Sequence, residues 1–267
     1  MNRNITTVGV VMKAQPFMEA DRKILILSPE HGLMEGVVYG IGKGKGRLSS
    51  VTDVLSQGDF YLYFEPVKKR LKVTDCEPVA LFSGIKEDLY RYFRAVLWVE
   101  IVLKSLGGSE TYPDVYRLLV TCLTLMNHTS FKEEIDLVHL QFLWRYILLQ
   151  GYTTGVDRCS RCGREMGEHE AAYYLAGEDP FICRACAGEA ERAAEAFAGR
   201  IRLREITAGA RRYLSHTMPL DLPDVLRVRL DPVSVRKAVG TFHSYLEEIV
   251  ESPFASLSLL EETENLK

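Results

Sequence analysis

The chain has 267 residues, of which 47% are hydrophobic and 26% are charged, so it has enough apolar material for two or three domains. Its formal net charge of −3 excludes a strongly basic polyanion-binding protein, but local basic patches act over a Debye length of about 8–10 Å. The longest apolar run, residues 95–103, is interrupted by Glu100 and is too short to span a membrane. The first residues lack the pattern of a signal peptide, so we expect a cytoplasmic protein with no membrane partner.

Short β-type runs fill the first part of the chain. They are rich in branched or aromatic residues and occupy residues 8–12, 24–27, 34–39, 60–64 and 71–73. Each run is too short for a helix, and turn residues separate the runs. Five short strands predict a small closed barrel over residues 1–78.

After Pro78 the apolar residues recur every three or four positions, as in helices. We expect helices over residues 89–103 and 113–126, and a third from Ser130 to Gly151 that opens with the capping box Ser130–Glu133. Further helices are expected within residues 188–197, 205–215 and 234–250. Residues 79–156 and 187–252 then form an α-helical domain, and residues 253–267 form a C-terminal tail. The predicted fold is a multidomain α+β protein.

Cys159, Cys162, Cys183 and Cys186 follow the spacing C-x2-C-x20-C-x2-C. This spacing is typical of four thiolates that share one tetrahedral zinc ion. The alternative is a pair of disulfides or four unrelated thiols. We expect one structural zinc per chain in a finger over residues 157–186, inserted in the helical domain, with a small hairpin within residues 171–182. The remaining Cys76 and Cys122 are expected to be buried.

No enzyme motif is complete. His169-Glu170 lacks the second histidine of a zinc hydrolase, and the cysteines lack the H-x-E motif of a zinc deaminase. The glycine-rich residues 40–47 do not match the spacing of a P-loop. Because four thiolates also leave no open metal position, we expect a protein that is not an enzyme.

Two basic groups lie in the predicted barrel. The flexible loop at residues 40–47 carries Lys43, Lys45 and Arg47, and the second group is Lys68, Lys69, Arg70 and Lys72. Such cations contact phosphates, while the neighbouring aromatic strand 60–64 offers rings for base stacking. The alternative for the loop is a solvated turn that binds nothing. The alternative for strand 60–64 is that its aromatic residues belong to the barrel core.

A third basic segment contains Arg200, Arg202, Arg204, Arg211 and Arg212. Only Glu205 is acidic nearby, so local ion pairs explain these arginines poorly. The segment is predicted to bind phosphate or an acidic partner peptide.

Several motifs together resemble the RecO family of bacterial DNA-repair proteins. They are residues 9–13, 19–25 (EADRKIL), 28–32 (SPEHG), the 40–47 loop leading into Leu48-Ser49-Ser50, residues 148–152 (LLQGY) and the four cysteines. The order of these motifs matches the family over nearly the whole chain.

The resemblance implies an OB-fold barrel on an α-helical domain that carries a zinc finger. It also implies a recombination mediator in the cytoplasm, at the nucleoid. Such a mediator binds single- and double-stranded DNA and anneals complementary strands. With RecR, it helps to load RecA on DNA coated by single-stranded-DNA-binding protein.

The family's DNA-contacting positions carry over to Arg22, Lys43, Lys45 and Arg47, and Lys23 lies beside them. The partner-binding arginines would receive the acidic C-terminal tail of the single-stranded-DNA-binding protein. The alternative is a protein–protein adaptor in repair with weak DNA binding of its own.

Overall fold

The computed structural model describes residues 3–41, 47–107, 110–153, 155–177, 180–196 and 203–265; the side chains of residues 47, 196, 261 and 263–265 are not described. The chain divides into two compact units, one formed by Met1–Asn127 with Ser256–Lys267 and the other by His128–Ala255. None of the described helices is long and apolar enough to cross a membrane.

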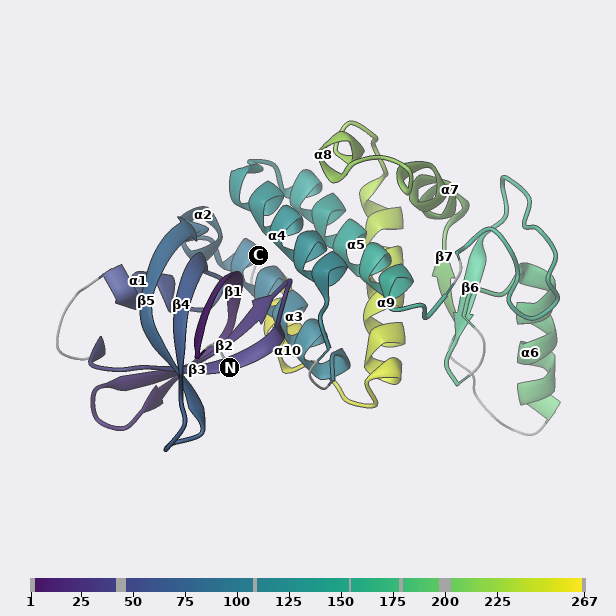
Figure 1. The fold of residues 1–267 in the computed structure, drawn as a ribbon. Helices are drawn as coiled ribbons and strands as arrows, with labels where there is room; N and C mark the ends of the chain where they lie inside the picture. The colour runs from purple at the N-terminus through teal and green to yellow at the C-terminus, as the bar shows by residue number, and fades with distance from the viewer. Residues whose placement is uncertain are drawn as a thin grey trace. The chain divides into compact units, whose positions relative to one another are not determined.

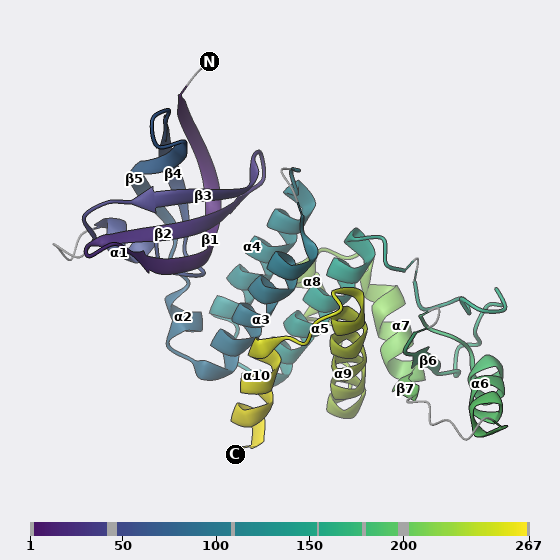
Figure 2. The ribbon, with the colours of Figure 1, turned by 90° about the horizontal axis from the view of Figure 1, so that it is seen from below.

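Five strands of the first unit close into a barrel of the OB type (Figures 1 and 2). They are β1 (Asn4–Phe17), β2 (Asp21–Ser28), β3 (Gly32–Val38), β4 (Gln57–Glu65) and β5 (Arg70–Ala80). The order around the barrel is β1-β2-β3-β5-β4; β3 and β5 are parallel, and the other neighbours are antiparallel. The predicted barrel is thus confirmed, with strands longer than the apolar runs that predicted them.

The alternation of side chains along each strand explains the barrel core. Ile24, Ile26, Phe60 and Leu62 point inward and are at most 2% exposed. Cys76 lies in the same core, as predicted for a lone thiol. Because successive side chains of a strand point to opposite faces, the residues between these positions lie on the outer face of the barrel.

The turn between β2 and β3 depends on a glycine. Gly32 has a φ of +66°, and a β-carbon at this position would collide with the carbonyl oxygen of Glu110. Both the conformation and the close approach therefore require glycine here.

Helices complete the first unit. They are α1 (Arg47–Val51), α2 (Ser83–Lys86), α3 (Leu89–Ser105), α4 (Pro113–His128) and most of α10 (Ala255–Asn265). Gln57 of β4 donates a hydrogen bond of 3.0 Å to the Tyr116 hydroxyl of α4, where Cys122 is also buried. The helix α10 lies beside α3 (Figures 1 and 2), and the Ser256 N–H donates to Glu100 over 2.8 Å. The sequence predicted no helix in this C-terminal segment.

The second unit is built on two long helices, with shorter elements around them. They are α5 (Lys132–Leu149), β6 (Ala172–Leu175), α6 (Arg184–Ala196), β7 (Leu203–Ile206), α7 (Ala208–Thr217), α8 (Leu222–Val225) and α9 (Pro232–Ile249). Trp144 of α5 stacks on Phe242 of α9 at 5.4 Å between ring centroids, and Phe181 packs edge-on against both rings. Since Phe181 lies two residues before Cys183, this aromatic core joins the cysteine module to the helices.

Three details differ from the sequence predictions. The predicted capping box is wrong, because α5 has Phe131 at its N-cap and no side chain caps it. The predicted hairpin is present only as a single antiparallel bridge, Tyr173 to Ile182, and the full partner of β6 is β7. The helix expected to begin at Glu205 begins instead at Ala208, since residues 203–206 form β7. Thr207 caps the helix by accepting from the Ala210 N–H.

Candidate metal centre and nucleic-acid interface

The first cysteine pair lies in a tight loop. The Gly163 N–H donates to the Cys159 carbonyl over 2.9 Å, and Gly163 has a φ of +72°. The Cys162 N–H points at the Cys159 Sγ, 3.5 Å away. The loop thereby turns both sulfurs to the same side.

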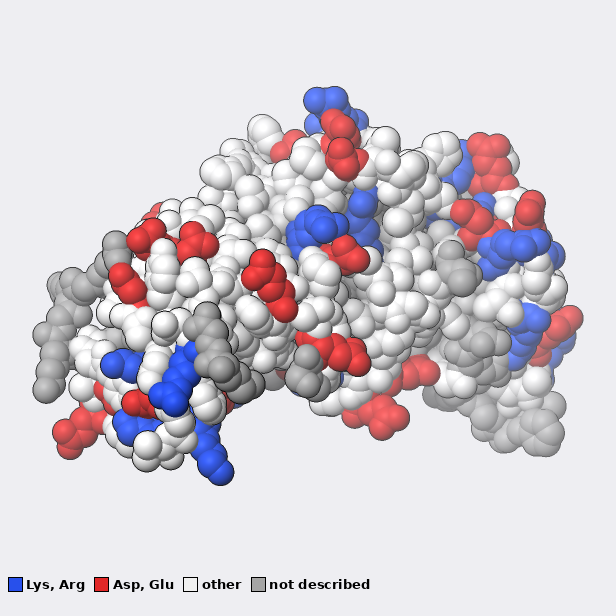
Figure 3. Space-filling view, viewed as in Figure 1, with Lys and Arg blue, Asp and Glu red and all other residues white. Residues whose placement is uncertain are grey.

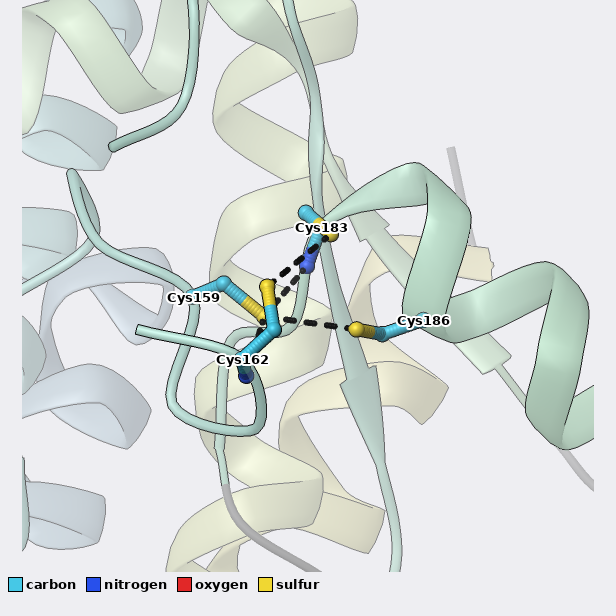
Figure 4. Close-up of side chains that lie close together, drawn as sticks. All are labelled: Cys159, Cys162, Cys183 and Cys186. Atoms are coloured by element: carbon cyan, nitrogen blue, oxygen red, sulfur yellow. Dashed lines mark hydrogen bonds between the residues drawn. The ribbon is translucent and has the colours of Figure 1, made fainter. Parts of the chain in front are cut away.

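The second pair lies where a helix begins. Cys183 directly precedes α6, and Cys186 is in its first turn, as Figure 4 shows. The Cys183 N–H also donates to the Cys159 Sγ, over 3.3 Å. The two pairs are therefore connected by hydrogen bonds to sulfur.

All four sulfurs lie within 4.8 Å of one another (Figure 4). The Sγ atoms of Cys159 and Cys186 are 3.8 Å apart, and those of Cys162 and Cys183 are 3.9 Å apart. A tetrahedral ion with metal–sulfur bonds of about 2.3 Å requires sulfur–sulfur separations of about 3.8 Å. A disulfide requires about 2.05 Å, so the four thiols are not paired as disulfides. The four predicted ligands are brought together, and their arrangement suits a metal ion.

The electrostatics of the cluster also suit a metal. Burial opposes ionisation of Cys159, but the N–H groups of Cys162 and Cys183 outweigh it and lower the pKa of this thiol to about 6. Burial likewise opposes ionisation of Cys183, but hydrogen bonds from Cys186 and Arg164 lower its pKa. Burial and the neighbouring thiols raise the pKa of Cys186. Thiolate character in the cluster matches the chemistry of a soft or borderline cation.

Arg164 and Glu170 support the cluster from outside. The Arg164 guanidinium makes a two-pronged ion pair with the Glu170 carboxylate and holds the pKa of Glu170 below its usual range. The same carboxylate accepts from the N–H groups of Gly167 and Arg184, the latter at the start of α6. Glu170 thus connects the first cysteine loop to the helix that carries the second pair.

Arg211 of α7 is buried, with 3% of its surface exposed. Its Nη1 donates to Asp157 over 2.7 Å, its Nε donates to the Glu170 carbonyl over 3.0 Å, and its Nη2 donates to the Gly167 carbonyl. The guanidinium is therefore occupied within the chain, where it fixes α7 to the cysteine module. Because its side chain is buried, Arg211 cannot contact the acidic peptide or phosphate that the sequence predicted for it.

The other arginines of this segment differ in position. Arg212 is 44% exposed at its side chain and forms a 3.0 Å ion pair with Glu168, while Arg204 is half-buried on β7. Arg200 and Arg202 lie outside the described residues. The expectation that Arg211 and Arg212 lack acidic neighbours is wrong, because Asp157 and Glu168, more than 40 residues earlier in the sequence, pair with them.

In the barrel, Arg22 and Lys23 point to opposite faces. The Arg22 Nη1 donates to the Asp53 carboxylate over 2.6 Å, and to the Ser49 carbonyl and the Thr52 hydroxyl over 3.2 Å each. Lys23 lies on the outer face and pairs with Glu35 over 2.7 Å. Arg22 therefore holds the segment after α1 against the barrel.

The outer face gathers further cations. Lys23, Val37, Lys72 and Tyr63 are paired in one register row across β2, β3, β5 and β4. The Lys68 and Lys72 ammonium groups lie 5.2 and 5.6 Å from the centre of the Tyr39 ring. We call Lys23, Tyr39, Tyr63, Lys68, Arg70 and Lys72 the outer cationic face. Figure 3 shows lysines and arginines gathered over the barrel, with acidic side chains among them.

Acids balance part of this charge. Arg70 lies over the Phe17 ring at 5.6 Å and is 3.8 Å from Glu65, which also contacts Lys68 at 3.5 Å. For Lys72, no ion pair is found among the described residues. Lys69 is exposed in the turn between β4 and β5, with a φ of +49°. Lys43 and Lys45 lie outside the described residues, as does the side chain of Arg47.

The aromatic strand is divided between the two faces of the barrel. Phe60 is buried in the core, Tyr61 and Tyr63 are half-exposed on the outer face, and Phe64 is 41% exposed. Tyr39 and Tyr63 were missed as individual site residues. The alternation in strand 60–64 was the signal that would have found Tyr63; Tyr39 follows β3 and is revealed only by the strand order.

Family models match both parts of the chain. The model described as Recombination protein O N terminal matches residues 1–82, and that described as Recombination protein O C terminal matches residues 86–258.

Curated relatives agree. The DNA repair protein RecO of Acetivibrio thermocellus is 23% identical over 98% of both chains, and that of Heliobacterium modesticaldum is 25% identical over 95% of this chain and 88% of its own. The protein of the same name from Moorella thermoacetica is 27% identical over 69% of this chain and 67% of its own. Because the two family models together match nearly the whole sequence, the chain belongs to the RecO family.

Proposed function

We propose that this chain is a DNA repair and recombination mediator that binds single- and double-stranded DNA and anneals complementary strands. With RecR, it assists the loading of RecA on DNA coated by single-stranded-DNA-binding protein. The relatives named DNA repair protein support the class of function. The outer cationic face supports the DNA contact.

The observation that carries the proposal is the row formed by Lys23, Val37, Lys72 and Tyr63. Its two lysines suit phosphates, and Tyr63 and the adjacent Tyr39 suit unpaired bases. Val37 between the lysines is only 3% exposed, so the contacts in our proposal come from Lys23, Lys72 and Tyr63. The loop cations Lys43, Lys45 and Arg47 extend the same contact in our proposal.

We further propose that the ion held by the four cysteines is zinc and that its role is structural. Sulfur–sulfur separations of 3.8 and 3.9 Å fit this ion. Four thiolates complete a tetrahedral shell, so no position is left for water or substrate.

The test is a salt titration of oligonucleotide binding. In a variant with Lys23, Lys68 and Lys72 all changed to glutamine, we expect weaker binding of a single strand. The slope of log affinity against log salt should also flatten by about 2, because each phosphate contact contributes about 0.7. A second variant, with Lys43, Lys45 and Arg47 changed to alanine, measures how much the loop contributes to DNA affinity and to the salt slope.

The matched control changes Lys104, Lys132 and Lys237 to glutamine. It removes the same charge from helices and should leave the slope unchanged. An outer-face variant that binds with unchanged affinity and slope would rule out this face as the DNA contact.

A second candidate function is that of an adaptor that binds an acidic peptide. The exposed Arg212 is the observation that favours this function. An exposed ion pair such as Arg212–Glu168 stabilises little, so the arginine can exchange its partner carboxylate for another. Pull-down with a single-stranded-DNA-binding protein that lacks its acidic C-terminal tail tests this function. Undiminished capture would argue against it.

A further inference from the structure

A groove of about 630 Å³ opens beside the turn between β1 and β2. Met18, Asp21 and Arg22 line it from the barrel, Asp53 from the segment after α1, and Lys86 and Tyr92 from α2 and α3. All of these residues belong to the first compact unit. No sequence motif marks Lys86 or Tyr92 as a site residue.

Lys86 is the cation in this groove that is open to a new partner. Its ammonium donates to the neutral Ser56 hydroxyl over 2.7 Å, and among the described residues it has no ion pair. Burial lowers the pKa of Lys86, and the charge of Asp53 acts in the opposite direction. A cation that has lost part of its hydration interacts more strongly with an anion that enters the groove.

The acids of the groove fit a ligand that also carries hydrogen-bond donors. Asp53 is neutralised by Arg22 at 2.6 Å, and Asp21 accepts the Gly40 N–H over 2.9 Å. Each carboxylate has lone pairs left for the exocyclic amines of bases. Tyr92 is half-exposed, and the exposed Met18 adds an apolar contact.

We propose that this groove holds one unstacked nucleotide of a single DNA strand, with Lys86 on its phosphate and Tyr92 against its base. This inference rests on the proposed function and extends it from the outer face of the barrel to α2 and α3. A bare phosphate would meet three acids, Glu19, Asp21 and Asp53, whereas a nucleotide uses both the cation and the carboxylates. A pocket of several hundred Å³ is also of the usual size for a small-molecule ligand. A base paired in a duplex cannot enter, so the groove should act on single strands only.

The experiment compares Lys86→Met and Tyr92→Leu with the parent protein. The probes are a 15-nucleotide deoxyadenosine strand, whose bases carry exocyclic amines, with one central 2-aminopurine, and the duplex of the same sequence. We expect each variant to bind the single strand about tenfold more weakly, since stacking or a phosphate contact is lost, and to bind the duplex unchanged. The change in 2-aminopurine fluorescence on binding should be lost in Tyr92→Leu and restored in Tyr92→Phe.

The control is Lys104→Met, which removes a lysine of α3 that pairs with Glu100 outside the groove. Equal melting temperatures show that all variants fold. Single-strand affinity and fluorescence that stay at the parent level in both groove variants overturn the inference. If the groove variants bind normally while the outer-face variant loses affinity, the proposed DNA binding is supported and the groove proposal is not. If the groove variants lose affinity while the outer-face variant binds normally, the groove proposal is supported and the outer face is not the DNA contact.

Discussion

Replacing Cys183 by serine should remove the metal from the protein and unfold the cysteine module. A hydroxyl is a poor substitute for a thiolate as a metal ligand. The variant also lacks the Cys183 sulfur that accepts a hydrogen bond from Arg164. Metal binding to small cysteine modules contributes about 10–16 kcal/mol, which exceeds what such a short segment gains by burying its own side chains. Elemental analysis should find one zinc ion per parent chain and none tightly bound in the variant.

Hydrogen exchange should locate the unfolding. Amides of residues 158–177 and 180–187 should lose protection in Cys183→Ser, whereas those of α5 and α9 keep much of theirs because the Trp144–Phe242 stack remains. The matched control is Cys122→Ala, which also removes a buried thiol but should retain one zinc per chain. A Cys183→Ser protein that keeps its full zinc content through dialysis against a chelator would contradict the assignment of the four ligands.

The second large effect is expected from Arg211→Met. The change leaves the carbonyl groups of Gly167 and Glu170 without their donor and breaks the ion pair with Asp157. Loss of such a buried network costs about 3 kcal/mol, or a fall of roughly 6–12 °C in melting temperature. The metal should also leave faster, because the loop that carries Cys159 and Cys162 loses its attachment to α7.

Arg212→Met is the matched control, since it removes a neighbouring arginine that pairs with the exposed Glu168 on the surface. It should change stability by less than about 1 kcal/mol. Thermal unfolding with metal present, together with the rate of zinc transfer to a chelator, measures both effects. Equal melting temperatures for the two variants would show that the Arg211 contacts do not hold the module.

The barrel and the metal ligands could be predicted because their signals are local. Strand alternation separates Ile24 and Ile26 from Lys23, and two C-x2-C pairs determine the ligand set. Neither depends on knowing which distant segments meet.

What could not be predicted depends on contacts between distant residues. β6 pairs with residues 203–206, which follow α6 in the chain, and no local sequence pattern predicts that pairing. Arg211 looked like a surface cation because its acceptors lie 41 to 54 positions earlier in the chain. The groove combines Arg22 with Lys86 and Tyr92, more than 60 positions later, so only the folded chain reveals it.

The return of α10 to α3 has a consequence for synthesis of the protein. The first compact unit takes in Ser256–Lys267, so its last piece is translated after the whole of His128–Ala255. Domains generally fold in order as they leave the ribosome. Here the α3 surface around Glu100 stays uncovered by α10 until Ala255–Asn265 has been translated.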